Sequence, residues 1–117
     1  MSEAFPDIEI YIKDVAENAL LEWLRSHFDI ESGKQTITLT RGTEKTACLI
    51  VPDAAKGGYT SVWFKSNHTP WPTDIDCARD AHKFLNKEAR CSTGSWENEE
   101  GGWLKINQQG ETKVVWE

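Results

Sequence analysis

The chain has 117 residues, of which 38% are hydrophobic and 27% are charged, and six of them are tryptophans. This length and composition exclude a disordered chain and predict a single globular domain over residues 1–117. Thirteen basic and nineteen acidic residues give a formal charge of -6. That charge disfavours nucleic acids and anionic membranes as partners, because their phosphates repel an acidic protein.

The cysteines and the apolar segments bear on the compartment. Cys48, Cys77 and Cys91 are an odd number and form no CxxC pair. The sequence shows no secretory leader and no apolar run of membrane-spanning length. We therefore expect a cytoplasmic protein with free thiols and no membrane partner.

The N-terminal third predicts a strand and a helix. Residues 7–13 alternate isoleucines with polar residues, which is typical of a half-buried strand. Residues 14–28 then place alanine, leucine, tryptophan and phenylalanine at helical spacing. Asp14 is positioned to cap this helix, and Glu17 supports its first turn.

Three strands are predicted in the middle of the chain. Residues 36–40 alternate threonine with isoleucine and leucine, as in a strand with one face in water. Residues 46–52 are apolar on both sides and indicate a central strand. Residues 59–65 follow a glycine turn and form the third strand.

A second helix and three more strands complete the pattern. The helix spans residues 74–88, with Thr73 as its N-cap and Asp76 three residues later in the position of a capping box. A short strand follows at residues 90–93, and residues 103–116 form a hairpin with a glycine in its turn.

These elements predict an α+β protein of order β-α-β-β-β-α-β-β-β. Adjacent strands joined by short turns imply a mainly antiparallel sheet of six to seven strands, with the two helices on one face. A ferredoxin-like arrangement with added strands is the related alternative.

Residues 68–82 hold two histidines, one cysteine and three aspartates, the densest group of reactive side chains in the chain. On a helix, Cys77 and His82 lie about 140° apart, so they cannot share the hydrogen bond of a thiolate–imidazole pair. The aspartates instead suit the first turn of a helix. We therefore interpret this segment as a helix entrance. No metal-ligand spacing or cofactor-binding motif is present, and we predict neither metal nor cofactor.

The predicted strands place aromatic and basic residues on the sheet face opposite the core. The candidate binding residues are Tyr11, Trp63, Lys65, Trp103 and Lys105, with Tyr59, Lys13 and Lys113 on the same side. Aromatic rings between ammonium groups can bind an acidic protein segment or stack single-stranded bases. The same residue types also stabilise a half-exposed sheet through cross-strand pairs and deter edge pairing.

The sequence therefore predicts a non-enzymatic protein-binding module, such as an adaptor, inhibitor or regulatory subunit, that engages an unidentified protein through this face. Two alternatives remain at this stage. One is a single-stranded nucleic-acid binder that uses the same face. The other is a small Cys/His-dependent enzyme in which Cys77 or His82 joins distant residues. The sequence leaves the oligomeric state open.

Overall fold

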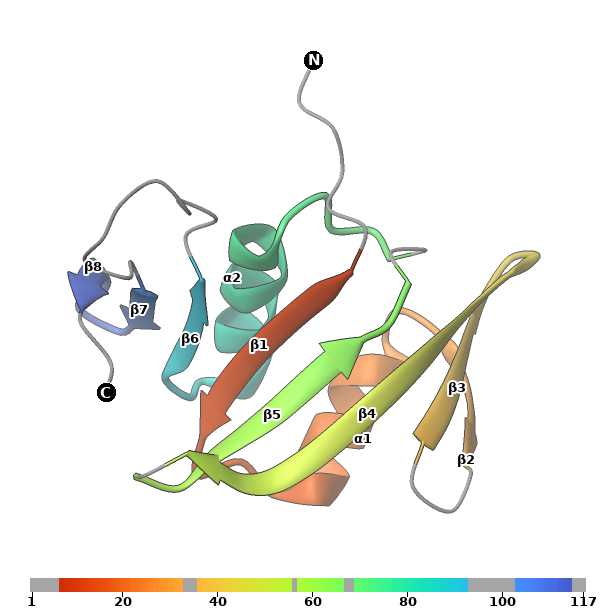
Figure 1. Cartoon of the computed structure of the whole chain (residues 1–117), viewed down its shortest axis with the longest axis horizontal. Coiled ribbons are helices and arrows are strands. Elements are labelled where there is room, and N and C mark those ends of the chain that lie inside the picture. Colours follow the sequence, from red (N-terminus) through yellow and green to blue (C-terminus); the bar gives the residue numbers. More distant parts are fainter. Residues whose placement is uncertain (1–6, 33–35, 56, 67–68, 93–102, 115–117) are drawn as a thin grey trace.

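The protein is built on one antiparallel sheet. The computed structural model describes residues 7–32, 36–55, 57–66, 69–92 and 103–114. The strands are β1 (Ile8–Lys13), β2 (Asp29–Ser32), β3 (Thr36–Arg41), β4 (Glu44–Ala55), β5 (Tyr59–Phe64), β6 (Ala89–Ser92), β7 (Trp103–Asn107) and β8 (Gly110–Val114), and the helices are α1 (Glu17–Arg25) and α2 (Asp74–Leu85). The sheet order is β2-β3-β4-β5-β1-β6-β7-β8, and all neighbours are antiparallel. Both helices lie behind the sheet in Figure 1.

This architecture confirms the predicted α+β class, the antiparallel sheet and the two helices on one face. The predicted strand count was too low, because the described residues form eight strands and β2 was missed. This strand is short and polar, and only Ile30 pairs with a core residue, Leu39. It lies at the sheet edge, where the exposed carboxylates of Asp29 and Glu31 deter further pairing. An edge strand of this kind needs no apolar alternation, so its sequence carried no strand signal.

The predicted start of the first helix was wrong. Helix α1 begins at Glu17, and Ala16 occupies the N-cap position without a side-chain hydrogen bond. Asp14 has a left-handed backbone with φ 51°, and its N–H donates to the carbonyl oxygen of Gly58 at 2.9 Å. A tertiary contact with the β4–β5 turn therefore fixes Asp14 and removes it from the helix.

The predicted start of the second helix is confirmed. The Thr73 hydroxyl accepts a hydrogen bond from the backbone N–H of Asp76 at 3.3 Å, as an N-cap does. The helix ends at Leu85, earlier than predicted, because Asn86 adopts a left-handed conformation. The N–H of Asn86 donates to the carbonyl oxygen of His82 at 2.8 Å and closes the last turn.

The hydrophobic core lies between the sheet and the two helices. The isoleucines of β1 and the side chains of Leu20, Trp23 and Phe64 are fully buried there. Trp71, which precedes α2, stacks on Trp23 with ring centroids 5.3 Å apart and is also buried. The Asp80 carboxylate joins the helices, since it accepts the indole N–H of Trp23 at 3.1 Å and contacts His27 Nε2 at 2.5 Å. Trp96, in a predicted loop, lies outside the described residues.

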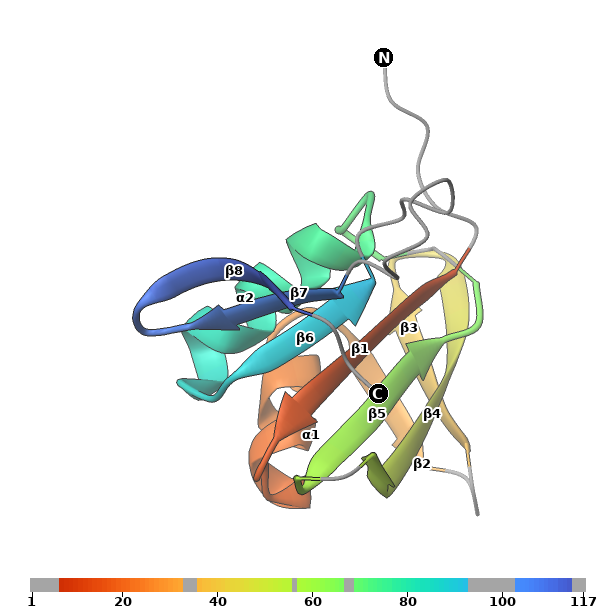
Figure 2. The same ribbon diagram turned by 60° about the vertical axis from the view of Figure 1, so that its left-hand side comes forward.

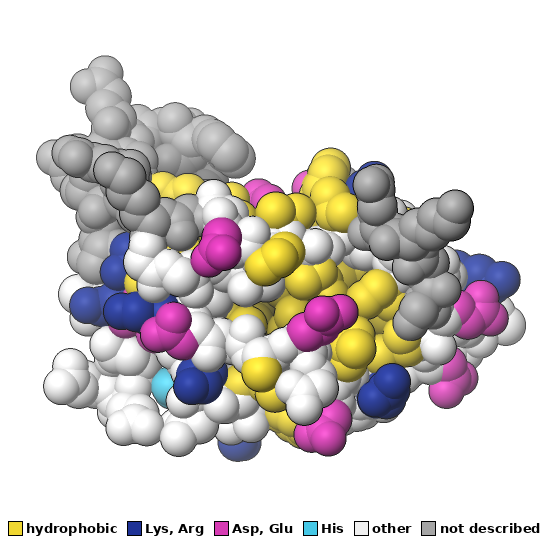
Figure 3. All heavy atoms as spheres, turned by 90° about the horizontal axis from the view of Figure 1, so that it is seen from below, with side chains coloured by type: hydrophobic (Ala, Val, Ile, Leu, Met, Phe, Trp, Pro, Cys, Tyr) yellow, Lys and Arg dark blue, Asp and Glu magenta, His cyan; other side chains and the backbone are white. Residues whose placement is uncertain are grey.

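Figure 2 turns the sheet so that the β7–β8 hairpin comes forward beside α2. Figure 3 views the molecule from below Figure 1 and shows hydrophobic side chains gathered on that side, with carboxylates among them. Partly buried residues that pack against the core include Leu21, Ile37 and Ile50. Ile37 pairs with Cys48 and Ile50 with Val62, so both lie on the helix side of the sheet.

Candidate functional site

The candidate site is the sheet face that no helix of the described residues covers. Tyr11 pairs with Ser61 and Arg90, between core residues on the same strand. Trp63 likewise alternates with Val62 and Phe64, whose side chains are fully buried on the helix side. Since successive strand residues point to opposite faces, Tyr11 and Trp63 lie on the uncovered face.

The other three predicted residues lie on the same face. Trp103 and Lys105 alternate with the buried Leu104 and Ile106 of β7. Lys65 continues the pairing of β5, since its N–H donates to the carbonyl oxygen of Ala47 at 2.8 Å. The predicted placement of Lys113 on this face was wrong. The register pairs Lys113 with the core residue Leu104, so position 113 belongs to the helix side.

The five residues form two groups rather than one. Lys65 Nζ lies 5.3 Å from the centroid of the Trp63 ring, close enough for a cation–π contact. Tyr11 meets Trp103 edge to face, with ring centroids 5.6 Å apart. Trp63 and Trp103 are separated by three strand spacings, about 14 Å. Lys105 lies beside the second group through its pairing with Arg90.

Tyr59 is on this face, but its side chain is buried. Its side chain is buried beneath the Arg90 guanidinium, which lies 4.9 Å from the ring centroid. Its hydroxyl donates a hydrogen bond to Glu88, and burial together with this bond raises the pKa of Tyr59 to about 12. Burial alone would raise the pKa of Glu88, but hydrogen bonds from Tyr59 and Arg90 outweigh it and lower that pKa.

Apolar residues of β4 were missed as part of the site. Leu49 pairs with Trp63 and is half-buried, and Val51 pairs with Ser61 and is 41% exposed. The pairing with β5 shifts register after Val51, so the strand bulges there. The sequence signal was present, since residues 46–52 are apolar on both sides. In a sheet with helices on one face, such a strand exposes apolar side chains on the other.

Polar contacts hold the rest of the face in place. The indole N–H of Trp63 donates to the carboxylate of Asp7 at 2.8 Å, and the Ser61 hydroxyl donates to Glu9 at 3.2 Å. Burial and the charge of Glu9 raise the pKa of Tyr11, partly offset by a hydrogen bond with Ser61. The bond to Asp7 fixes the orientation of the Trp63 ring.

The uncovered face also carries cationic side chains. Within the part of the chain that the structure describes, neither Lys65 nor Lys105 forms an ion pair with a carboxylate. Lys13 and Arg90 add two more cations, and Glu88 pairs with Arg90 at 3.1 Å. The carboxylates of Asp7 and Glu9 lie on the same face beside Trp63 and Ser61, so the face carries charges of both signs.

The cysteines lie in environments opposite to that of a catalytic thiol. Cys77 is fully buried, and burial raises the pKa of its thiol well above the ordinary value. Burial also raises the pKa of Cys48 and of Cys91 to about 12. Reactive cysteines need accessible, low-pKa thiolates. His82, the other candidate, contacts the carbonyl oxygen of Lys87 through Nδ1 at 2.9 Å.

Two further features of the described residues concern metal binding and membrane insertion. No group of three or more His, Cys, Asp or Glu side chains there is placed to hold a metal ion. No helix in that same part of the chain has the length and apolar character needed to cross a membrane. Comparisons of the chain with protein-family models, curated proteins and solved structures found no match.

Proposed function

We propose that this chain is a non-enzymatic protein-binding module, an adaptor, inhibitor or regulatory subunit, which engages an acidic segment of a partner through its uncovered sheet face. The observation that carries the proposal is the group formed by Leu49, Val51 and Trp63. These apolar side chains lie partly exposed on a face that the described helices leave bare. Exposed apolar patches on soluble proteins mark sites of interaction.

The composition of the face matches that of protein interfaces. Tryptophan and tyrosine dominate interface energetics because they bury a large area at little cost in side-chain entropy. Trp63 and Tyr11 are held by neighbours, so a partner need not order them on binding. A stable interface buries roughly 800 Å² on each partner, which calls for contact with both aromatic groups.

The charges indicate the chemistry of the partner. Lys65 stands beside Trp63, and Lys105 lies near Trp103 on the same strand, so each aromatic group has an ammonium at its margin. Charges at the rim of an interface speed association and select partners more than they add affinity. We expect the partner segment to carry carboxylates that flank apolar side chains.

The cysteines support a cytoplasmic location as part of this proposal. All three are free and buried in the core. A reducing compartment keeps such thiols unpaired.

The test is a capture experiment with matched variants. The tagged protein is incubated with extract of the native host, with and without nuclease, and the captured protein is then purified and its Kd is measured. We expect Trp63→Ala/Trp103→Ala to weaken binding by at least about tenfold, the loss of one interface hot spot. Phe84→Ala is the control, because Phe84 is 50% exposed on α2, away from this face.

Other outcomes separate the alternatives. Capture that disappears with nuclease and falls steeply with salt would favour the nucleic-acid function of the same face. Equal binding by wild type and by the folded double variant would show that the aromatic residues stabilise the sheet and do not contribute to binding.

A further inference from the structure

Strand β8 forms one outer edge of the sheet, at the end of the β7–β8 hairpin (Figure 2). It pairs with β7 on one side, and no described residue pairs with its other side. Glu111 and Thr112, in the middle of the strand, are exposed. An unpaired edge of this kind presents backbone N–H and C=O groups to which a further strand can bind.

The hairpin register determines which backbone groups of β8 point outward. Residues 108–109 form the turn, so Asn107 and Gly110 close the hairpin as a hydrogen-bonded pair. Such pairs alternate along an antiparallel ladder, so every second residue from Gly110 bonds to β7. The N–H and C=O groups of Glu111 and Lys113 therefore face away from the sheet, and no described residue forms a backbone hydrogen bond to them there.

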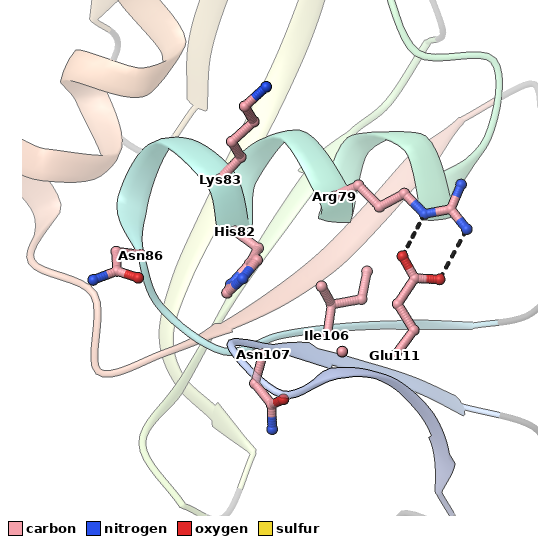
Figure 4. Close-up of a pocket in the computed structure, with 8 residues that line it drawn as sticks. Arg79, His82, Lys83, Asn86, Ile106, Asn107 and Glu111 are labelled. Carbon is pink, nitrogen blue, oxygen red and sulfur yellow. Dashed lines mark hydrogen bonds and ion pairs between the residues drawn. The ribbon is translucent and has the colours of Figure 1, made fainter.

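A contact with α2 holds this edge in place. Figure 4 shows the Glu111 side chain directed toward the helix, where its carboxylate forms a bidentate ion pair with Arg79. The two N–O distances are 2.6 and 2.8 Å. Because β8 is already extended and fastened, a second strand can pair with it without first ordering it, which lowers the entropic cost of association.

The sequence of β8 is complementary to itself. When two copies of the strand pair antiparallel about a position centred on Thr112, Glu111 of each copy lies opposite Lys113 of the other. These are the two residues whose backbone groups point outward, so each such pair can exchange both of its N–H···O bonds. A register centred on Glu111 or on Lys113 would instead place like charges opposite each other, which is destabilising.

The opposite edge of the sheet lacks this complementarity. Strand β2 carries the exposed carboxylates of Asp29 and Glu31 and no basic residue. A symmetric antiparallel pair of β2 strands would therefore bring carboxylates of the two copies together. Of the two edges, β8 is the one whose charges fit a second copy of this chain.

We propose that this chain forms a symmetric dimer in which β8 pairs antiparallel with β8 of a second copy, centred on Thr112. The two-fold axis is perpendicular to the sheet, so the helices of both copies lie on the same side of one continuous sheet. The uncovered faces of the two copies then adjoin on the other side. The dimer is independent of the protein-binding function, because none of the aromatic residues of that face takes part in it.

The test is analytical ultracentrifugation of the full-length chain from about 10 μM to about 1 mM. We expect the mass to rise from 13.3 kDa toward twice that value. The Kd should be on the order of 100 μM, because a pair of short strands buries less surface than a permanent interface does. In ¹⁵N NMR spectra, the amides of residues 110–114 should shift most with concentration. A chain that stays monomeric at 1 mM, or a dimer whose shifts lie away from β8, would overturn the proposal.

Charge variants test the register. Lys113→Glu places carboxylates opposite each other across the axis, and Glu111→Lys does the same with ammonium groups, so we expect each variant alone to weaken the dimer by at least about tenfold. An equimolar mixture of the two restores opposite charges in both pairs and should dimerise. Lys45→Glu makes the same charge change at an exposed position on β4 and should alter the Kd less than about twofold.

A backbone variant tests the hydrogen bonds. Lys113→Pro removes an N–H that faces away from β7, so the hairpin keeps its own bonds while the dimer loses two of its bonds through the symmetry. We expect this folded variant to remain monomeric at 1 mM. Wild-type dimerisation by Lys113→Pro, or a mixture of the charge variants that stays monomeric, would reject pairing through β8.

Discussion

The two faces of the sheet can be compared on a single strand. Phe64 and Trp63 are neighbours on β5, yet they meet different surroundings. The Phe64 ring is fully buried and lies within 6.4 Å of the rings of Trp23, Phe28 and Trp71, measured between centroids. Trp63 is half-buried, and its described contacts include the Lys65 ammonium and the Asp7 carboxylate.

Residues on the helix side of the sheet stabilise the fold, whereas the aromatic residues on the uncovered side are positioned by it. On the helix side, apolar side chains pack against one another, and their burial provides most of the folding free energy. On the uncovered side, the rings are positioned by charged and hydroxyl groups that could equally have been satisfied by water. Such an arrangement adds little stability and leaves a shaped surface available to a partner.

The largest contrast is expected in thiol reactivity. Cys48, Cys77 and Cys91 all lie in the core, and burial raises the pKa values of their thiols. A thiol reagent can therefore react with them only after local or global unfolding exposes them. We expect labelling by iodoacetamide to be at least about a thousandfold slower in the native protein than in denaturant, since unfolding costs 5 kcal/mol or more in typical domains. Mass spectrometry of each labelled site measures this. Rapid labelling of any one cysteine would revive the catalytic alternative.

The next largest effect is on stability and compares the two neighbours of β5. Phe64→Ala removes a ring from the centre of an aromatic cluster and should lower the free energy of unfolding by about 3–5 kcal/mol. Trp63→Ala leaves no enclosed cavity and should cost less than about 1.5 kcal/mol. Urea unfolding of both variants provides the comparison. Similar losses would show that the uncovered face is part of the core.

Much of this contrast could be predicted from the sequence, because each strand carries its own alternation. The isoleucines of β1 indicated which side faces the helices, and the same reasoning placed Tyr11 and Trp63 on the other. The start of α2 was also predictable, since the Thr73 cap depends on residues only three positions apart. Local patterns specify these features.

The features that were missed depend on partners distant in the chain. Strand β2 exists through its pairing with β3, and Asp14 is fixed by Gly58. The buried Tyr59 contacts Arg90 and Glu88, which follow the second helix in the sequence. The exposure of Leu49 and Val51 follows from the number of helices available to cover the sheet. No local pattern in β4 contains that information.

A smaller effect on stability is expected from Asp74, the first residue of α2, whose carboxylate accepts the backbone N–H of Glu9 on β1. Burial, together with the charges of Asp7 and Glu9, raises the pKa of Asp74 to about 6, although a backbone N–H from Glu9 partly offsets this. Because the pKa of this carboxyl group is higher in the folded protein than its ordinary value of 3.8, the native state binds the proton more tightly than the unfolded chain does. The native state therefore gains stability as the pH falls from about 6 toward 3.8.

Asp74→Asn tests this assignment. The amide keeps an oxygen for the Glu9 N–H but carries no charge. We therefore expect the variant to be more stable than wild type at pH 7, by about 1 kcal/mol or less after solvent screening. The difference should shrink as pH falls from 6 toward 4, where wild-type Asp74 is protonated in the native state. Unfolding curves at several pH values measure it. A difference independent of pH would contradict the raised pKa.

The smallest effect should come from the apolar residues of the uncovered face. Leu49→Thr/Val51→Thr preserves a preference for strand structure and removes apolar surface that the described core does not use. We expect the free energy of unfolding to change by no more than about 0.5 kcal/mol per site. The same change at Ile10, on the helix side of β1, should be far more costly, because it buries a hydroxyl group among apolar side chains. If Leu49→Thr/Val51→Thr leaves the fold intact but weakens partner capture, these residues serve binding rather than folding. A large loss of stability would mean instead that some other part of this chain covers the face, and that the surface proposed for a partner is already occupied.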